Sequence, residues 1–290
     1  MPSALAWLST FYARRVVKPA LGDLSDVRRV RRVFNARLPA PSGVRFEPAV
    51  MGGIPGEWVR AKNATHQATG SAPRTMLYLH GGGFVGCSPR THRPITAAFA
   101  RRGWSVFVPD YRLAPEHPFP APLEDVVAAW RGLVDHHASQ QPGGPGMGDA
   151  GTPPNTPRLV VAGDSAGGQL SLALMIHERD AGRRLPDAAA LLSPATDLTG
   201  GSASLVENSD RDALFHGPSL RHLVAFYLQG ADPAQPLASP LNADLSGLPP
   251  LVVHAAASEA LRDDATRLAA KAREAGVRVQ MQLWPGVGHV

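Results

Sequence analysis

The chain has 290 residues, of which 44% are hydrophobic and 18% are charged, with a formal net charge of +5. This composition can form a large buried core and excludes a disordered, self-repelling chain. The single cysteine, Cys87, excludes an intrachain disulfide framework and a cysteine-based zinc site.

No apolar run approaches the about 18 residues that cross a bilayer, so we expect no stable membrane insertion. The first apolar stretch, Ala4 to Leu8, has basic residues behind it rather than ahead of it. This order is the reverse of a signal peptide and predicts a cytoplasmic protein.

Residues 1–43 carry much of the positive charge. The spacing of Leu5, Leu8 and Tyr12, and then of Val27, Val30 and Phe34, predicts two amphipathic helices. The charge raises nucleic acid as a partner, but no recognised module accompanies it, so we expect none and keep a nucleic-acid binder as an alternative. The basic residues, which face only Asp23 and Asp26, are Arg14, Arg15, Lys18, Arg28, Arg29, Arg31, Arg32 and Arg37.

After Pro39–Pro41 the chain alternates short apolar runs with segments of helical periodicity. Alternation of this kind predicts a mostly parallel α/β sheet with covering helices. Strands are expected within 44–61 (two, with a turn), 75–79, 104–108, 158–162, 188–192, 251–257 and 277–284, and helices over 123–136, 169–179 and 263–275.

Two segments interrupt this alternation. Gln140 to Pro157 is rich in Gly and Pro and predicts an exposed loop. Glu207 to Gln229 has apolar residues at helical spacing between two expected strands and predicts an inserted cap. We therefore expect N-terminal cap helices over 1–43, core over 44–206, inserted cap helices over 207–229 and the rest of the core over 230–290.

Gly163-Asp-Ser-Ala-Gly167 follows one expected strand directly and precedes a helix. A serine on such a tight turn projects its hydroxyl out of the sheet, and the flanking glycines tolerate the crowding. The sequence therefore predicts that Ser165 is a nucleophile. A glycine-rich structural turn is the alternative.

His80-Gly-Gly-Gly-Phe84 ends another expected strand. Glycines let backbone amides point into a cavity, where they can bind a developing oxyanion. A phosphate-binding loop would need a following lysine, which is absent, and a structural turn remains an alternative.

The serine needs a histidine and an acid. His289 follows the last expected strand in a loop rich in Gly and Pro, and Glu259 follows the strand before it, at the edge where α/β sheets hold their sites. Asp263 and Asp264 fit the first turn of a helix, which favours negative charge, and Asp197 is a further candidate acid. The order Ser165, Glu259, His289 is the one expected for an α/β-hydrolase.

The chain from about 44 to 290 resembles the bacterial hormone-sensitive-lipase family of esterases. The resemblance is carried by the histidine–glycine motif, by Asp110-Tyr-Arg-Leu-Ala-Pro-Glu-His117 and by the serine motif with Gly168. It implies an α/β-hydrolase fold with a helical cap, Ser165 as nucleophile and His289 as base. It also implies that the amides of Gly82, Gly83 and Ala166 form the oxyanion hole. The family usually has Asp-Pro-Leu where this chain has Glu259-Ala-Leu.

We therefore predict a serine carboxylesterase that hydrolyses short-chain acyl esters through an acyl-enzyme, with no metal or organic cofactor. A non-catalytic small-molecule binder on the same fold is the alternative. Relatives continue past the histidine into a closing helix, whereas this sequence has one residue more, so we expect a homodimer near the exposed last strand. The expected apolar lining of the pocket is Trp7, Leu8, Phe11, Tyr12 and Phe34.

Overall fold

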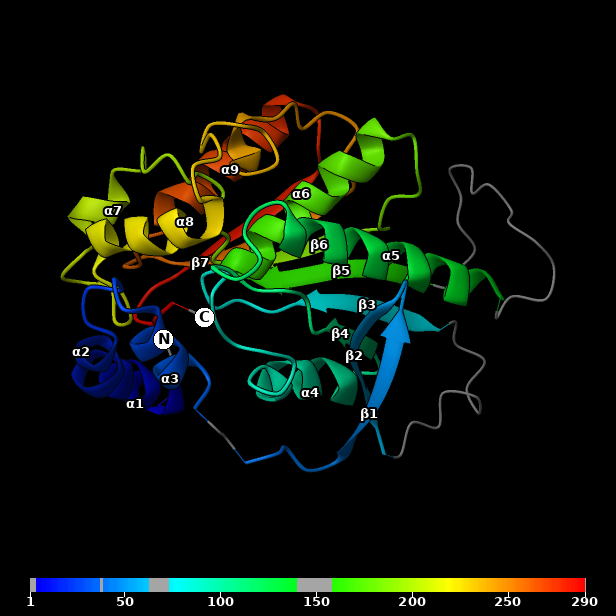
Figure 1. The fold of residues 1–290 in the computed structure, drawn as a ribbon, viewed down its shortest axis with the longest axis horizontal. Coiled ribbons are helices and arrows are strands. Elements are labelled where there is room, and N and C mark those ends of the chain that lie inside the picture. Colours follow the sequence, from blue (N-terminus) through cyan, green and yellow to red (C-terminus); the bar gives the residue numbers. More distant parts are fainter. Residues whose placement is uncertain (1–3, 37–38, 63–72, 140–157, 290) are drawn as a thin grey trace.

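The computed structural model describes residues 4–36, 39–62, 73–139 and 158–289 (Figure 1). In this part of the chain an eight-stranded sheet has the order β1-β2-β4-β3-β5-β6-β7-β8. The first two pairings, β1 with β2 and β2 with β4, are antiparallel, and all others are parallel. The strands are β1 (Val44–Met51), β2 (Ile54–Ala61), β3 (Arg74–Leu79), β4 (Ser105–Pro109), β5 (Arg158–Asp164), β6 (Ala189–Leu192), β7 (Leu251–Ala256) and β8 (Val279–Trp284). The predicted mostly parallel α/β sheet is confirmed.

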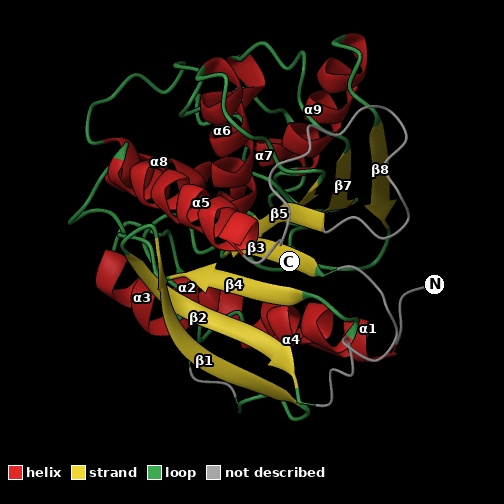
Figure 2. Cartoon of the chain, turned by 90° about the vertical axis from the view of Figure 1, so that its right-hand side faces the viewer, coloured by secondary structure: helices red, strands yellow, loops and turns green. Residues whose placement is uncertain are grey.

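The central strands are apolar on both faces because helices cover both faces. In β3, Leu77 and Leu79 belong to one core cluster, and Met76 and Tyr78 belong to the other. The larger cluster lies beneath α5 (Ala121–Ser139), α6 (Ala166–Asp180) and α9 (Arg262–Glu274), and the smaller one beneath α4 (Arg93–Arg101) (Figure 2).

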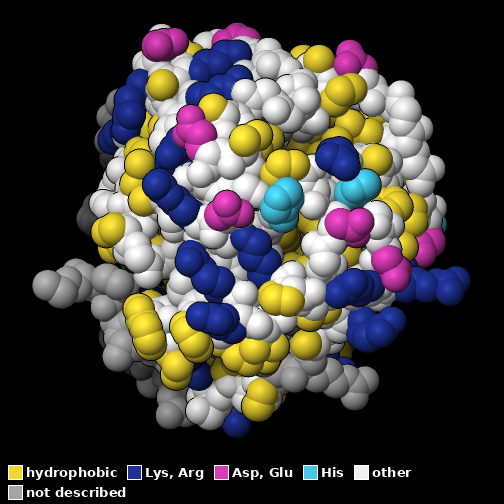
Figure 3. Space-filling view, turned by 90° about the vertical axis from the view of Figure 1, so that its left-hand side faces the viewer, with side chains coloured by type: hydrophobic (Ala, Val, Ile, Leu, Met, Phe, Trp, Pro, Cys, Tyr) yellow, Lys and Arg dark blue, Asp and Glu magenta, His cyan; other side chains and the backbone are white. Residues whose placement is uncertain are grey.

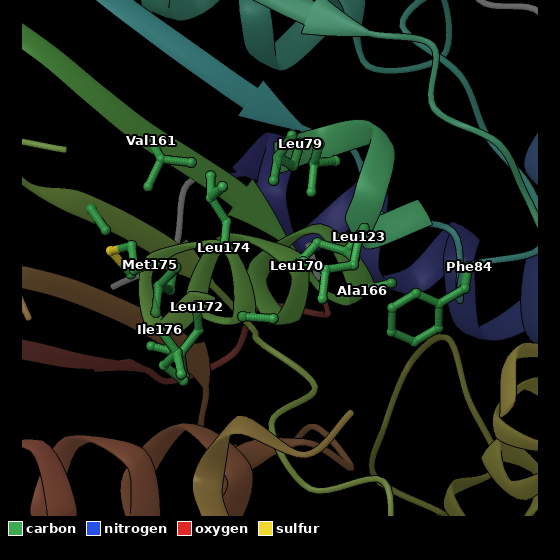
Figure 4. Packing of buried hydrophobic residues seen from close by; sticks show 14 of the residues in the cluster. Leu79, Phe84, Leu123, Val161, Ala166, Leu170, Leu172, Leu174, Met175 and Ile176 are labelled. Atoms are coloured by element: carbon green, nitrogen blue, oxygen red, sulfur yellow. The ribbon is translucent and has the colours of Figure 1, made fainter. Parts of the chain in front are cut away.

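Helix α6 is buried almost all round, which explains why its sequence is apolar on every side. Figure 4 shows Ala166 and Leu170 at the start of this helix close to Leu123 of α5 and Phe84 of the glycine loop. The helix that follows Ser165 is therefore fixed by packing in the centre of the molecule.

Two helical segments lie at the end of the sheet to which the parallel strands point (Figure 1). One is a continuous N-terminal run of α1 (Ala4–Tyr12), a π turn (Ala13–Val17) and α2 (Lys18–Leu21), followed by α3 (Val27–Phe34). The other contains α7 (Ser204–Glu207), a 3-10 turn (Gly217–Ser219) and α8 (Leu220–Leu228), and a later 3-10 turn (Pro240–Asn242) packs against α6 and α9. The Lys18 ammonium links them, because it donates hydrogen bonds to the carbonyls of Ser209 and Asp212 at 2.6 and 2.8 Å. We propose that residues 1–43 and 207–229 form the cap and that 44–206 and 230–290 form the core.

Element bounds shift by up to three residues, and three differences from the predicted elements have a physical cause or change the domain bounds. Helix α4 was not predicted, because its buried face consists of small or polar residues, Thr96, Ala97 and Ala100, and gives no apolar periodicity. The last strand begins at Val279 rather than Val277, because the Val277 amide donates to the Ala272 carbonyl at the end of α9. The helical part of the second segment begins at Ser204, before the predicted 207.

The loop predicted over 140–157 lies outside the described residues. Among the residues that the structure does describe, no helix is both long enough and apolar enough to span a bilayer.

Candidate active site

Ser165 lies at the tip of a sharp turn between β5 and α6, with φ 52° and ψ −117°. The turn brings the two elements so close that only glycine fits two positions before and two positions after the serine. A Cβ on Gly163 would lie 2.4 Å from the Gly167 carbonyl oxygen, and a Cβ on Gly167 would lie 1.9 Å from the Leu79 carbonyl oxygen. Strained backbone of this kind costs about 1–3 kcal/mol and is typical of functional sites. The Ser165 amide is held by the Leu192 carbonyl at 2.8 Å.

Ser165 forms part of the wall of a cavity of about 320 Å³. Most of the wall is apolar, and it comes from the glycine loop, from the segment after β6 and from α7 and α8. Cavities of this size and polarity bind small molecules. The lining residues are Gly83, Phe84, Ser165, Ala166, Ala195, Asp197, Leu198, Thr199, Gly200, Leu205, Val206, Phe215, Gly217, Pro218, Leu220, Arg221, Leu223, Val224 and Leu261.

His289 and Glu259 form a hydrogen-bonded pair in the loops after β8 and β7. The distance from His289 Nδ1 to Glu259 Oε2 is 2.9 Å, and the two side chains are 3% and 0% exposed. His289 Nε2 is buried and has no hydrogen-bond partner among the described residues. A carboxylate on Nδ1 fixes the imidazole tautomer that leaves Nε2 able to accept a proton. The structure brings together the histidine and the acid that the sequence predicted.

The pKa of His289 is raised above its ordinary value. Burial acts to lower it, but the hydrogen bond and the negative charge of Glu259 outweigh burial, with smaller contributions from Asp212 and Asp164. When the buried imidazole gains a proton, Glu259 therefore stabilises its charged form.

The other candidate acids have structural partners instead. Asp264 is buried and accepts hydrogen bonds from the amides of Thr196 and Asp197, at 2.7 and 2.9 Å, and burial raises its pKa to about 7. Asp263 accepts from the Ser204 amide at 2.9 Å and pairs with Arg262. Asp197 pairs with Arg267, 2.7 Å away, and lines the cavity.

The glycine loop after β3 places backbone amides next to the serine turn. Gly82 and Gly83 have φ of +112° and +58°, a region that favours glycine, and the Gly82 carbonyl accepts from the amides of Val85 and Gly86. In the described part of the chain the amides of Gly82, Gly83 and Ala166 donate no hydrogen bond. They are the amides that the family resemblance implies for an oxyanion hole, and they remain available for a ligand oxygen.

A buried carboxylate beneath the glycine loop was not predicted. Asp164 accepts hydrogen bonds from the Tyr78 hydroxyl at 2.8 Å and the Gly81 amide at 3.1 Å, and it contacts His92 Nε2 at 3.2 Å. Burial acts to raise the pKa of Asp164, but the charge and hydrogen bond of His92 and the Tyr78 hydroxyl lower it. Asp164 therefore joins the strand before Ser165 to the loop that carries the expected oxyanion hole.

The sequence indicates only part of this buried cluster of Asp164, Tyr78 and His92. Asp164 immediately precedes the serine in its motif, so its place in the turn was visible, but its role was not. His92 precedes the helix that sequence periodicity missed.

Helix α3 supports the site from outside the cavity. The Phe34 ring meets Phe215 edge to face, 6.4 Å between centroids, and Phe215 meets His289 in the same way at 5.1 Å. The predicted apolar lining was wrong: the cavity wall does not include Phe34 or the α1 residues, and these α1 side chains are largely exposed, namely Trp7, Leu8, Phe11 and Tyr12.

Comparison with known proteins shows relatives with the same fold. Residues 76–290 match a family described as having the alpha/beta hydrolase fold. An acetyl-hydrolase of Streptomyces hygroscopicus is 40% identical over 263 residues, which are 90% of this chain and 79% of the relative. An esterase of Acinetobacter venetianus is 32% identical over 86% of this chain and 76% of its own length.

Solved structures agree as well. An esterase of the bacterial hormone-sensitive-lipase family is 35% identical, with a TM-score of 0.81 over 100% of this chain and 91% of that one. The esterase EstE5, soaked with p-nitrophenyl butyrate, is 35% identical with a TM-score of 0.84 over 100% and 90%. Fold, motifs and relatives together define an α/β-hydrolase. Within that class the chain belongs to the bacterial hormone-sensitive-lipase family, and it is a carboxylic ester hydrolase.

Asp164→Asn tests the contribution of the buried cluster. The Asn side chain replaces one carboxylate oxygen with an NH2 donor, which then faces the donors of Tyr78, Gly81 and His92. At least one buried donor loses its acceptor, and leaving a buried donor unpaired costs about 1–3 kcal/mol. We expect kcat to fall about 5- to 150-fold, with a smaller change in KM, because the glycine loop shifts relative to Ser165. Steady-state kinetics of folded protein measure this effect.

Asp187→Asn is the matched control, since Asp187 also accepts a backbone amide, that of Leu159, but at the start of β5. Equal kcat values for Asp164→Asn and wild type would contradict a positioning role.

Proposed function

We propose that the chain is a serine carboxylesterase that acts through an acyl-enzyme, with Ser165 as nucleophile, His289 as base and Glu259 as the acid. The observation that carries this proposal is the buried hydrogen bond between His289 and Glu259, with His289 Nε2 left unpartnered. The strained turn that presents Ser165 to an apolar cavity supports it.

In the first half-reaction, Ser165 Oγ attacks the ester carbonyl while His289 Nε2 takes the hydroxyl proton. Negative charge then develops on the carbonyl oxygen, and the free amides of Gly82, Gly83 and Ala166 stabilise it. His289 returns the proton to the leaving alcohol as the tetrahedral intermediate collapses to the acyl-enzyme. In the second half-reaction, water attacks the acyl-enzyme by the same route and releases the acid.

The substrate class that we propose is a short-chain acyl ester. An apolar cavity of about 320 Å³ favours a small aliphatic acyl group over a long chain. One relative is named an acetyl-hydrolase, and one similar structure was soaked with p-nitrophenyl butyrate. Both names refer to short acyl groups and support this choice of substrate.

A non-catalytic small-molecule binder is the alternative. Such a protein has no need of a buried histidine whose tautomer and charge are set by a carboxylate, so the His289–Glu259 pair favours the enzyme.

We also propose that the protein is cytoplasmic. We further propose that it forms a homodimer in which the β8 edges of two chains pair. The support is narrower than the sequence suggested, because Val277, Val279 and Met281 pack against the main core, and only Leu283 and Trp284 of the strand are exposed large apolar residues. β8 is the last strand of the sheet, and an edge strand has unpaired amides and carbonyls. We expect light scattering to give twice the chain mass at micromolar concentration, and a monomer would contradict the proposal.

Ser165→Ala is expected to abolish esterase activity while the fold is retained, because alanine keeps the Cβ that the strained turn already accommodates. Loss of a serine nucleophile reduces kcat by about a millionfold. Hydrolysis of p-nitrophenyl esters of increasing acyl length measures both activity and the size of the acyl group that fits. Labelling of the wild type by an organophosphate at any residue other than Ser165 would refute the assignment.

Glu259→Gln and Asp263→Asn distinguish the two acids. Glu259→Gln is expected to lower kcat by about three to four orders of magnitude, since the histidine loses the partner that sets its tautomer. Asp263→Asn removes a charge at the start of α9 and is expected to cost under about 1 kcal/mol of stability, with kcat unchanged. The reverse result would identify Asp263 as the acid.

The pH profile gives a second measure of the same pair. His289 acts as base in its neutral form, so kcat/KM rises as pH passes its pKa, which lies above the ordinary histidine value. Without the negative charge in Glu259→Gln, that pKa falls and the rising limb moves to lower pH. A limb that stays in place would show that Glu259 does not set the charge of the base.

A further inference from the structure

The outer face of the N-terminal helical run is apolar. Among the described residues nine large hydrophobic side chains are exposed, and five of them lie in this single run, each between 46% and 61% exposed. They recur at helical spacing and form one stripe, and the rings of Trp7 and Phe11 stack with centroids 5.6 Å apart. The stripe consists of Trp7, Leu8, Phe11, Tyr12 and Val16.

Cations border this stripe. Arg14 and Arg15 lie on the same run between Tyr12 and Val16; the Arg15 guanidinium lies over the Phe11 ring at 5.5 Å, and the Arg14 guanidinium donates to the Arg211 carbonyl. Arg28 and Arg32 of the adjoining α3 are exposed and have no ion pair among the described residues. Figure 3 shows hydrophobic side chains gathered along the lower part of the face that carries these helices, with Lys and Arg side chains directly beside them.

Two acids, Asp23 and Asp26, belong to these helices, and Asp210 and Asp212 lie close to Lys18. Asp26 accepts hydrogen bonds from the amides of Arg28 and Arg29 as the N-cap of α3, and Asp23 accepts from Ser25. Arg15, Arg28 and Arg32 nevertheless form no ion pair in the described part of the chain.

The inner face of the same run contacts the loop that carries His289. A Cβ on Gly288 would lie 3.7 Å from Thr10 Oγ1, so the helix passes directly over the residue before the histidine. Lys18 bonds the carbonyl of Asp212, whose carboxylate in turn accepts from the Ala260 amide, next to Glu259. A partner that binds the outer face of this helical run therefore also stabilises the loop that carries His289.

We propose that this apolar stripe, with Arg15 and with Arg28 and Arg32 of α3, docks on an anionic lipid surface. Aromatic and aliphatic side chains bordered by arginine are the composition of helices that lie in the membrane interface. Trp and Tyr favour this interface, and anionic headgroups pair with the arginines. A second copy of the chain is a poorer occupant, because two-fold pairing of the stripes would bring like charges together.

Sedimentation with vesicles tests the docking. The full chain is mixed with vesicles of phosphatidylcholine alone or of an equimolar mixture with phosphatidylglycerol. We expect a partition coefficient at least about tenfold higher for the anionic vesicles, falling as salt increases. Ser165→Ala is expected to bind equally well, so loss of docking and loss of catalysis can be told apart.

Two variants locate the surface. Trp7→Ser with Phe11→Ser removes apolar contact, and Arg15→Gln with Arg28→Gln and Arg32→Gln removes charge. Each is expected to lower partition onto anionic vesicles at least about tenfold while hydrolysis of a water-soluble ester is retained.

The controls are Val50→Ser, an exposed apolar residue on β1, and Arg90→Gln with Arg183→Gln and Arg278→Gln, which remove three exposed charges elsewhere. They are expected to bind as the wild type does. Three results would overturn the proposal: no vesicle binding by the wild type, equal losses in the control variants, or a stripe occupied by a second copy, seen as a dimer that Trp7→Ser with Phe11→Ser dissociates.

Discussion

The contact between the end of β3 and the start of α6 fixes the rest of the site. A Cβ on Gly167 would lie 1.9 Å from the Leu79 carbonyl oxygen and 2.6 Å from that of His80. The strand and the helix can therefore touch only because this position is glycine. Their contact places the glycine loop and the serine turn side by side, as the proposed oxyanion hole requires. The buried Asp164 carboxylate then ties the two together through Gly81.

The hydrogen-bonded pair of His289 and Glu259 comes from the other half of the sheet. Glu259 and His289 are 30 residues apart, and each follows a strand at the same edge, β7 and β8. Parallel strands bring their carboxyl ends together, so a short loop after each is sufficient. Burial of both side chains strengthens their interaction and keeps water from competing for it.

Much of this was predictable from the sequence, because the information is local. Gly163 to Gly167 predicts a tight turn by composition, and strong apolar runs predict the strands that flank it. Glu259 was chosen over Asp263 because it directly follows a strand, and it is the residue that the structure places against His289.

Other features depend on contacts that no local pattern encodes. The cavity wall was assigned to apolar residues of α1, but an amphipathic stripe does not show which of its faces meets the core, and the wall instead comes largely from the segment around α7 and α8. Helix α4 packs through Thr96 and Ala97, too small or polar for a periodic signal. His92 acquires its partner only when α4 places it beside Asp164.

The attachment of α3 has a consequence for how the N-terminal region can diverge. The Arg31 guanidinium bonds the carbonyls of Val85 and Ala114, at 2.7 and 2.9 Å, and pairs with Glu116. A planar fork that serves three acceptors on two loops cannot be replaced by the single ammonium of lysine. Sequence drift in these helices is therefore restricted at one arginine, while their solvent-facing positions can change and give related enzymes different outer surfaces over the same catalytic centre.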